Sequence, residues 1–333
     1  MSLEVVRSGP LSLVQDAGRP GLAAIGVSPS GAFDRTAFAR GAMLIGNDPA
    51  LQAAIEVTLG GLSVRAVGPV TLALTGAECP ATIDGRVAAW GRPFLLDTGE
   101  LLTLGLPRTQ LRSYLSVAGG IDVPPVLGSR STDLLSGLGP PRVTARMVLP
   151  IGSPPMVPEE LASAAPQTVP EELVSAAPQT VPEELVSAAP QTVPEELVSA
   201  ASERHEGPPP PPTLELLPGP RTDWLADAEA LATSWTISPD SNRVGIRLTG
   251  TVLERSPSRV GAELPSEPLV RGAVQLPPSG QPVIFGPDHP TTGGYPVVAV
   301  LTEESSDQLA QCRPGDLVTL VWALRDATVA PLP

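Results

Sequence analysis

The sequence contains no lysine, and each of its 21 basic side chains is an arginine. A P-loop ATPase needs a lysine on the β- and γ-phosphates of its nucleotide, and a pyridoxal phosphate enzyme needs one to form its Schiff base. Both mechanisms are therefore excluded within this chain alone. A nucleotide bound to it would have to be held by arginines, by backbone N–H groups or by a partner.

Cysteine and aromatic residues are scarce as well. Cys79 and Cys312 are far apart, and no Cys-x-x-Cys pair or His/Cys cluster occurs. The sequence thus lacks the spacing of a zinc site, and we expect neither a metal nor a covalent cofactor in this chain. Two distant cysteines without a signal sequence predict buried thiols rather than a disulfide. Aromatic residues make up 3% of the chain, so a core must be built from Val, Leu, Ile and Ala.

No segment has the pattern of a targeting signal or a membrane span. Residues 1–14 lack a basic stretch followed by a long apolar run, and no apolar run reaches the ~18 residues that cross a bilayer. These absences predict a cytoplasmic protein. The net charge of −14 also argues against nucleic-acid binding through a broad basic surface.

Composition divides the chain into three regions, 1–152, 153–213 and 214–333. The middle region holds tandem twelve-residue units that begin VPEEL (157–204), followed by the polyproline run 208–212. Each Pro-Glu-Glu start favours a helix, but the next proline ends it after roughly eight residues, too few for a stable helix in water. We interpret this region as a disordered, acidic, Pro-rich linker. A docking segment for a partner is the alternative.

The outer regions alternate short apolar runs with Gly- and Asp-containing turns, which is typical of a mainly β protein with barrel-like closure. Three segments, 34–45, 223–231 and 306–312, predict helices, and Asp34 is a candidate N-cap for the first. The pattern leaves open whether the two outer regions form one domain or two.

The first candidate site lies near the N-terminus, where Gln15, Asp16 and Arg19 share a Gly-containing loop. A guanidinium binds a carboxylate or a phosphate through paired hydrogen bonds, so Arg19 would suit either group. An internal Asp16–Arg19 ion pair is the alternative. The loop around Ser30 precedes the first predicted helix and either binds an anion or is simply capped. Glu56, in an apolar strand, needs a partner such as an arginine or a substrate amide.

The second candidate site lies in the last region. Arg243 and Arg247, four residues apart, would point to the same face of an extended strand and bind an anion together, unless that face is simply solvated. Further on, a nine-residue segment beginning at Asp288 combines a carboxylate, an imidazole, two hydroxyls and a phenol. General acid–base catalysis near neutral pH would fall to Asp288, His289 or Glu267.

Seven stretches of the sequence, taken in order, resemble a single family. They are GPLSLVQDAGRPG, GVSPSGAFDRTAF, LIGNDPALQAAIEVTLGG, SVAGGIDVPPVLGSRSTD, SNRVGIRLTG, LVRGAVQLPPSGQPV and DHPTTGGYPVVAV. Together they resemble the KipA (PxpC) or allophanate hydrolase subunit 2 family, which includes the C subunits of bacterial 5-oxoprolinase. This family is similar in turn to the second half of the biotin-dependent carboxyltransferase domain of urea carboxylase. The resemblance covers nearly all of the chain except about 153–213.

The resemblance implies a cyclophilin-like β-barrel architecture with a few short helices. It implies an ATP-dependent enzyme that opens 5-oxo-L-proline to L-glutamate. Two partners are implied, a B subunit of the KipI or PxpB type and an A subunit of the PxpA type, with ATP shared with a partner. This chain would then be inactive alone.

The resemblance also suggests roles for single residues. Thr292 and the backbone of Gly293 and Gly294 would stabilise a developing oxyanion, and an arginine would hold a carboxylate or a phosphate. The catalytic candidates are Asp288, His289, Thr292 and Glu267. The substrate-binding candidates are Gln15, Asp16, Arg19, Ser30, Arg243, Arg247, Gln275, Gly293, Gly294 and Tyr295.

The chain departs from the family at Asn242, where Asp is frequent, at Pro290, where Gln is frequent, and at Pro268, where Gly is common. The first two departures argue against those side chains as catalytic groups, and none affects the expected fold. Two other functions also stay open. One is a biotin-dependent carboxyltransferase for urea or a related amide, whose biotin carrier must be another protein because this chain has no lysine. The other is a KipA-like regulatory protein that binds a partner.

Overall fold

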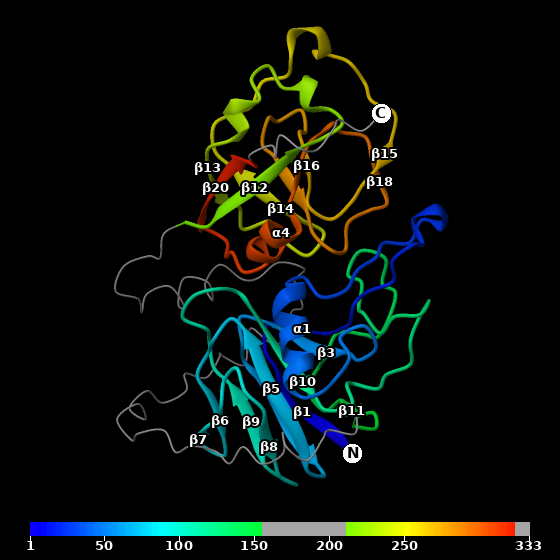
Figure 1. Ribbon diagram of the computed structural model, residues 1–333, viewed down its shortest axis with the longest axis vertical. Coiled ribbons are helices and arrows are strands. Elements are labelled where there is room, and N and C mark those ends of the chain that lie inside the picture. Colours follow the sequence, from blue (N-terminus) through cyan, green and yellow to red (C-terminus); the bar gives the residue numbers. More distant parts are fainter. Residues whose placement is uncertain (155–210, 324–333) are drawn as a thin grey trace. The chain divides into compact units, whose positions relative to one another are not determined.

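A computed structural model describes residues 1–154 and 211–323 (Figure 1). The chain forms two compact units, residues 1–208 (unit 1) and 209–333 (unit 2). The repeats at 157–204, and with them most of the predicted linker, lie outside the described residues.

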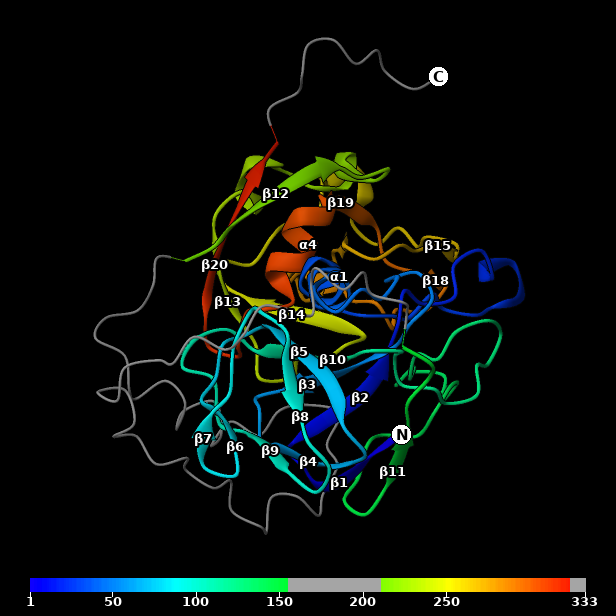
Figure 2. The same ribbon diagram turned by 60° about the horizontal axis from the view of Figure 1, so that its bottom comes forward.

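Unit 1 contains two antiparallel sheets. The first has the strand order β11 (Val148–Pro150), β1 (Ser2–Ser8), β4 (Leu62–Val67), β9 (Leu101–Leu104), β6 (Ala81–Ile83) and β7 (Arg86–Val87). The second has the order β2 (Leu11–Gln15), β3 (Ala54–Thr58), β10 (Arg112–Val117), β5 (Val70–Gly76) and β8 (Phe94–Leu96), and Figure 2 shows these strands side by side. Buried Leu, Ile, Val and Ala side chains from both sheets form the main core, as the scarcity of aromatics predicts.

Helix α1 (Arg35–Leu44) packs on β5 and β10 of the second sheet (Figure 1). The Asp34 side chain accepts a hydrogen bond from Ala37 N at 2.8 Å and caps the helix. The predicted helix at 34–45 and its N-cap are therefore confirmed. This cap fixes the point at which the preceding loop, which carries Ser30, meets the sheet.

Unit 2 is a closed seven-stranded barrel, so the predicted mainly β class and barrel architecture are confirmed. Its strands, in order around the barrel, are β12 (Thr213–Pro218), β19 (Val297–Leu301), β16 (Ala273–Gln275), β17 (Val283–Phe285), β14 (Gly245–Thr249), β13 (Ser234–Ile237) and β20 (Leu317–Trp322). β12 and β20, the first and last of these in sequence, close the barrel by pairing in parallel. The other neighbouring strands in the barrel are antiparallel.

Side chains alternate between the inside and the outside of the barrel. On β14, Ile246 and Leu248 are buried, while Arg247 and Thr249 are exposed. A separate two-stranded sheet pairs β15 (Glu267–Pro268) with β18 (Thr292–Gly293).

The helix expected at 306–312 is present but begins earlier, as α4 (Glu303–Leu309). Thr302 sets the start, because its hydroxyl accepts a hydrogen bond from Ser305 N at 3.2 Å. No helix in the described part of the chain has the length and apolar character to span a bilayer.

The single helix expected at 223–231 is wrong. Two 3-10 turns, η4 (Thr222–Trp224) and η5 (Glu229–Leu231), occupy this segment. The backbone becomes extended at Leu225 and forms a β-bridge with Arg255, which breaks the helix. Two further 3-10 turns are η1 (Ala23–Ile25) and η6 (Pro257–Arg259).

Candidate functional site

The first predicted site forms where three loops of unit 1 meet. The loop after β2 joins the loop before α1 through hydrogen bonds from Arg19 N to Pro29 O (2.7 Å) and from Ala32 N to Asp16 O (3.0 Å). A third segment brings in Thr132, whose N–H donates to the carbonyl of the penultimate residue of β2 at 3.0 Å. Backbone pairing therefore assembles residues that are more than a hundred positions apart.

Arg19 is a buried cation whose guanidinium is only partly hydrogen-bonded. The residue is 2% exposed, and Nη2 donates to Ser131 O at 2.5 Å. Nε and Nη1 have no partner within residues 1–154 and 211–323, and the same is true of Gln15 Oε1 and Thr132 Oγ1. The Gln15 amide is oriented by Nε2, which donates to Thr132 O at 2.9 Å. A buried cation with unmet donors is costly by itself and attracts an anion.

The Asp16–Arg19 ion pair, offered above as an alternative, does not form between these two described residues. The Asp16 carboxylate instead accepts hydrogen bonds from Ser131 Oγ (2.5 Å), Ser129 Oγ (2.6 Å) and Arg130 N (2.5 Å). Asp16 therefore fixes the segment that carries Ser131. The Ser131 carbonyl then holds the Arg19 side chain.

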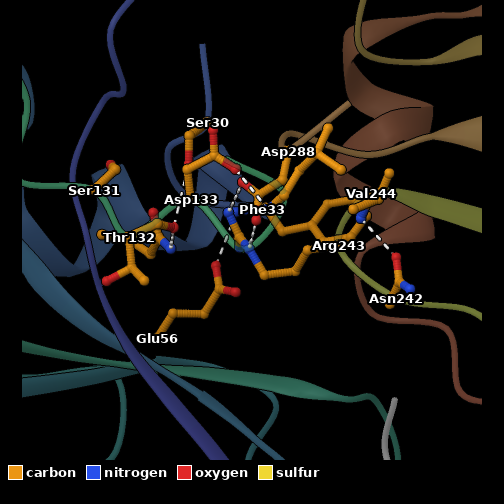
Figure 3. A network of polar contacts seen from close by, with 12 residues as sticks. Ser30, Phe33, Glu56, Ser131, Thr132, Asp133, Asn242, Arg243, Val244 and Asp288 are labelled. Carbon is orange, nitrogen blue, oxygen red and sulfur yellow. Dashed lines mark hydrogen bonds and ion pairs between the residues drawn. The ribbon is translucent and has the colours of Figure 1, made fainter. Parts of the chain in front are cut away.

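A buried carboxylate braces the loop before α1. Glu56 Oε2, on β3, accepts a hydrogen bond from Phe33 N at 2.9 Å (Figure 3). It also accepts one from Tyr114 Oη at 2.8 Å, and Arg112 Nε lies 3.7 Å from Oε1. Burial, and then the charge of Glu56, raise the pKa of Tyr114 well above its ordinary value, so the phenol keeps its proton and donates. The prediction that Glu56 needs a partner is confirmed, and the partners are Arg112 and Tyr114.

Ser30 reaches the Arg19 loops through its hydroxyl, which donates to Thr132 O at 3.3 Å. It has a φ of 50°, and the next residue, Gly31, has a φ of 94°. A Cβ on Gly31 would lie 3.0 Å from Gly18 N, so only glycine lets the two loops approach. The structure thus brings together four of the predicted binding residues, Gln15, Asp16, Arg19 and Ser30.

In unit 2, the prediction that Arg243 and Arg247 share one strand face is wrong. β14 begins two residues after Arg243, which lies in a turn where Asn242 Oδ1 accepts a hydrogen bond from Val244 N at 2.8 Å (Figure 3). Arg243 is 1% exposed and binds Asp288 twice, from Nε to Oδ2 (2.9 Å) and from Nη2 to Oδ1 (3.0 Å). Arg247 lies on β14 and is exposed.

The partners of the other predicted catalytic side chains restrict what they can do. His289 is buried, and its Nδ1 donates to Pro290 O at 2.8 Å, so this nitrogen is already engaged by the backbone. Glu267 forms an ion pair with Arg221, and that hydrogen bond lowers the pKa of Glu267. Glu267 is therefore ionised at neutral pH and cannot supply a proton. Thr292 is exposed on β18.

Three predicted binding residues of unit 2 line one pocket of about 480 Å³, namely Arg247, Gln275 and Tyr295. Gln275 Nε2 donates to Tyr295 O at 2.9 Å. This bond passes over Gly293, where a Cβ would lie 2.5 Å from Gln275 Nε2. Glycine at position 293 therefore allows the Gln275 amide to reach the segment that carries Tyr295. Gly294 lies between Gly293 and Tyr295 in the sequence.

Sequence reasoning missed the residues that hold these side chains in place. Ser131 and Thr132 support Arg19 and Gln15 in unit 1, and Arg221 pairs with Glu267 in unit 2. The only available signal for the first two was the hydroxyl-rich stretch GSRSTD among the family motifs. No spacing rule links it to Arg19, which lies 112 positions away from Ser131.

Cys79 should not react as a nucleophile in the folded protein. Both cysteines are buried and free, as predicted, and burial raises the pKa of the Cys79 thiol to about 12. At pH 8 its thiolate fraction should then be about 1,000-fold below that of an ordinary thiol. We expect iodoacetamide to leave Cys79 unmodified in the native protein and to modify it in urea, as read by peptide mass spectrometry. Equal labelling rates in both conditions would contradict this.

The comparisons with known proteins agree on one family. The model of the carboxyltransferase domain, subdomains A and B, matches residues 25–322. The chain belongs to this family. The resemblance seen in the sequence motifs is thereby confirmed.

Two bacterial relatives match the chain over most of their length. The chain is 35% identical to the C subunit of 5-oxoprolinase from Escherichia coli, over 96% of this chain and 90% of that protein. It is 29% identical to the C subunit of 5-oxoprolinase from Haemophilus influenzae, over 92% of this chain and 86% of that protein.

Two of the solved structures that match belong to longer chains. The urea amidolyase of Kluyveromyces lactis superimposes with a TM-score of 0.76 at 27% identity, over 96% of this chain but 18% of that one. Another matching structure is covered over 55% of its length. This family fold thus occurs both as a separate subunit and as part of larger proteins.

Proposed function

We propose that this protein is the C subunit of an ATP-dependent 5-oxoprolinase, which opens 5-oxo-L-proline to L-glutamate. In this proposal the chain works in a complex with a B subunit of the KipI or PxpB type and an A subunit of the PxpA type. The observation that carries the proposal is the similarity to the C subunit of the Escherichia coli 5-oxoprolinase over nearly the full length of both chains.

The distribution of arginines supports this reaction. A reaction between 5-oxoproline and ATP brings two anionic groups together, a carboxylate and a polyphosphate. The chain has two arginines in the predicted sites that lack an acidic partner among the described residues, Arg19 in unit 1 and Arg247 in unit 2. Arg243 is already paired with Asp288 and is a poor candidate for holding a ligand.

The absence of lysine bears on how ATP would be held. Arginines and backbone N–H groups of this chain can supply only part of a triphosphate site, and no Walker-type lysine is available. We therefore propose that the nucleotide is shared with a partner subunit, and that this chain is inactive alone.

The test is an assay of glutamate release from 5-oxoproline and ATP with this chain co-purified with its B and A partners. We expect release from the complete complex and none when any one chain is omitted. A stable three-chain complex that releases no glutamate would contradict the proposed substrate. Consumption of ATP without glutamate release would contradict it as well, because the phosphoryl group would then pass to water without opening the lactam.

The runner-up function is carboxyl transfer to urea or a related amide, and the match to urea amidolyase favours it. This function needs a biotinylated carrier, which must be another protein because this chain has no lysine. Supplying urea and a carrier protein whose biotin has already been carboxylated, by a biotin carboxylase with ATP and bicarbonate, to the purified chain distinguishes the two functions. Carboxylation of urea would support the runner-up, and release of glutamate by the three-chain complex would support the oxoprolinase.

A further inference from the structure

A pocket on the outer face of the unit 2 barrel has the geometry of a ligand site. Arg247 on β14 lies opposite Val283 on β17, and Val283 lies opposite Gln275 on β16, so that the three side chains form one row across three strands. Phe285 is two residues further along β17 and adds an aromatic surface beside Val283. The pocket measures about 480 Å³, within the ~300–1,000 Å³ typical of small-molecule sites.

Two polar groups in this pocket are available to a ligand. Within the described residues, the Arg247 guanidinium makes no hydrogen bond and no ion pair, and Gln275 Oε1 accepts no hydrogen bond. Gln275 is 4% exposed, and the bond from its Nε2 to Tyr295 O determines which way the amide points. The carbonyl oxygen is therefore presented as a fixed acceptor, whereas Arg247 is an exposed cation at the opposite wall.

The spacing of these groups suits a small ligand between them. Neighbouring strands lie about 4.8 Å apart, so the Cα atoms of Arg247 and Gln275 are about 10 Å apart with Val283 as the floor between them. A long arginine side chain and a glutamine can both reach a molecule that rests on Val283 and Phe285. The ligand must offer an anion to Arg247, an N–H or O–H to Gln275 Oε1, and an apolar surface to the floor.

Polyphosphates fit this pocket poorly. Arg247 is the only basic side chain among the described residues that line it, and the chain has no lysine. A single guanidinium balances a carboxylate, but a triphosphate needs several cations or a metal ion.

We propose that this pocket binds a monocarboxylate whose carboxyl carbon is attached to an apolar ring that carries an amide N–H. Resting on the function proposed above, the ligand is the lactam substrate 5-oxoproline. Its carboxylate binds Arg247, its ring N–H donates to Gln275 Oε1, and its ring methylenes rest on Val283 and Phe285. Arg19 in unit 1 is then left for a different anion.

Calorimetric titration of the full-length chain tests the site without requiring turnover. Three probes separate the contacts: 5-oxo-L-proline, 2-pyrrolidinone, which lacks the carboxylate, and 5-oxotetrahydrofuran-2-carboxylate, which has a ring oxygen in place of the N–H. We expect the wild-type chain to bind 5-oxo-L-proline at least about 10-fold more tightly than either of the other two probes. Losing a hydrogen bond to a charged group, or leaving a buried acceptor unpaired, each costs enough binding free energy for such a difference.

Two variants assign these preferences to residues. Arg247→Met should weaken binding of 5-oxoproline about 10- to 100-fold and remove the preference over 2-pyrrolidinone. Gln275→Met should remove the preference for the lactam over the lactone while keeping the preference for the carboxylate. Arg40→Met, an exposed arginine on α1 in the other unit, is the matched control and should bind as wild type does.

The outcomes separate the pocket from the proposed function. Unchanged binding of 5-oxoproline in Arg247→Met, or no binding by the wild-type chain, overturns the assignment of the pocket even if the three-chain complex releases glutamate. Binding that depends on Arg247 and Gln275 in a chain whose complex releases no glutamate supports the pocket and overturns the oxoprolinase function.

Discussion

Replacing Arg19 by methionine is expected to abolish most activity without destabilising unit 1. The free energy of unfolding should stay the same or rise by up to about 2 kcal/mol. The variant removes a buried, uncompensated cation, which is unfavourable, and loses only one favourable hydrogen bond, to Ser131 O. In the proposed complex, kcat/KM for glutamate release should fall at least about 30-fold, since the variant removes the cation that a buried anion would need.

The measurement requires a readout for each unit. Hydrogen exchange with mass spectrometry on peptides from β3 and β10 reports the opening of unit 1 alone. Arg40→Met is the matched control, because it makes the same substitution on an exposed position of α1 and should change neither stability nor activity. A loss of more than about 2 kcal/mol in Arg19→Met, similar to that of an ordinary core variant, would mean that Arg19 serves structure rather than a ligand.

Arg243→Met should instead destabilise unit 2 strongly. Arg243 and Asp288 are 1% and 0% exposed and share two hydrogen bonds, so removing the cation leaves a buried carboxylate that has lost its main partner. Removing one member of such a pair costs about 3–5 kcal/mol. Protection from hydrogen exchange in peptides from β14 and β20 should fall by a corresponding amount.

Two further variants show whether the charge is responsible. The double variant Arg243→Met, Asp288→Leu should recover part of the lost stability, because no single charge is then left in the interior. Arg247→Met should change the free energy of unfolding by no more than about 0.5 kcal/mol, since Arg247 is exposed. A destabilised double variant, no better than the single one, would show that the packing around Arg243 matters more than its charge.

These three arginines show what the sequence can and cannot predict. Each was a reasonable ligand for a carboxylate on sequence grounds, because a guanidinium is suited to one wherever it occurs. Their environments differ: Arg19 is buried with unmet donors, Arg243 is buried and paired, and Arg247 is exposed in a pocket. Whether Arg243 shares a strand face with Arg247 depends on where β14 begins. The boundaries of a strand are predicted less reliably than its existence.

Local patterns gave reliable predictions where the signal itself was local. The cap at Asp34 and the helix that follows it depend on neighbouring residues, and so does the alternation of strands that indicated a mainly β fold. The helix expected at 223–231 failed because Leu225 pairs with Arg255, a contact that no local pattern contains. A tertiary contact overrode the local preference there.

The candidate sites were predictable in part for the same reason. Gln15, Asp16 and Arg19 stand together in sequence and stay together in space. Their supports, Ser131 and Thr132, come from the other end of unit 1. No local pattern links these distant segments to Arg19, because only backbone pairing between the loops brings them together.

Both units pair their first strand with their last described one, and this affects their folding during synthesis. β1 pairs with β11 in unit 1, and β12 pairs with β20 in unit 2. Since the carboxyl end of a nascent chain leaves the ribosome last, β12 has no partner on that edge until Trp322 has emerged. An uncovered strand edge is a template for pairing with other chains. The half-made barrel is therefore the stage at which this edge of β12 is open to pairing with other chains.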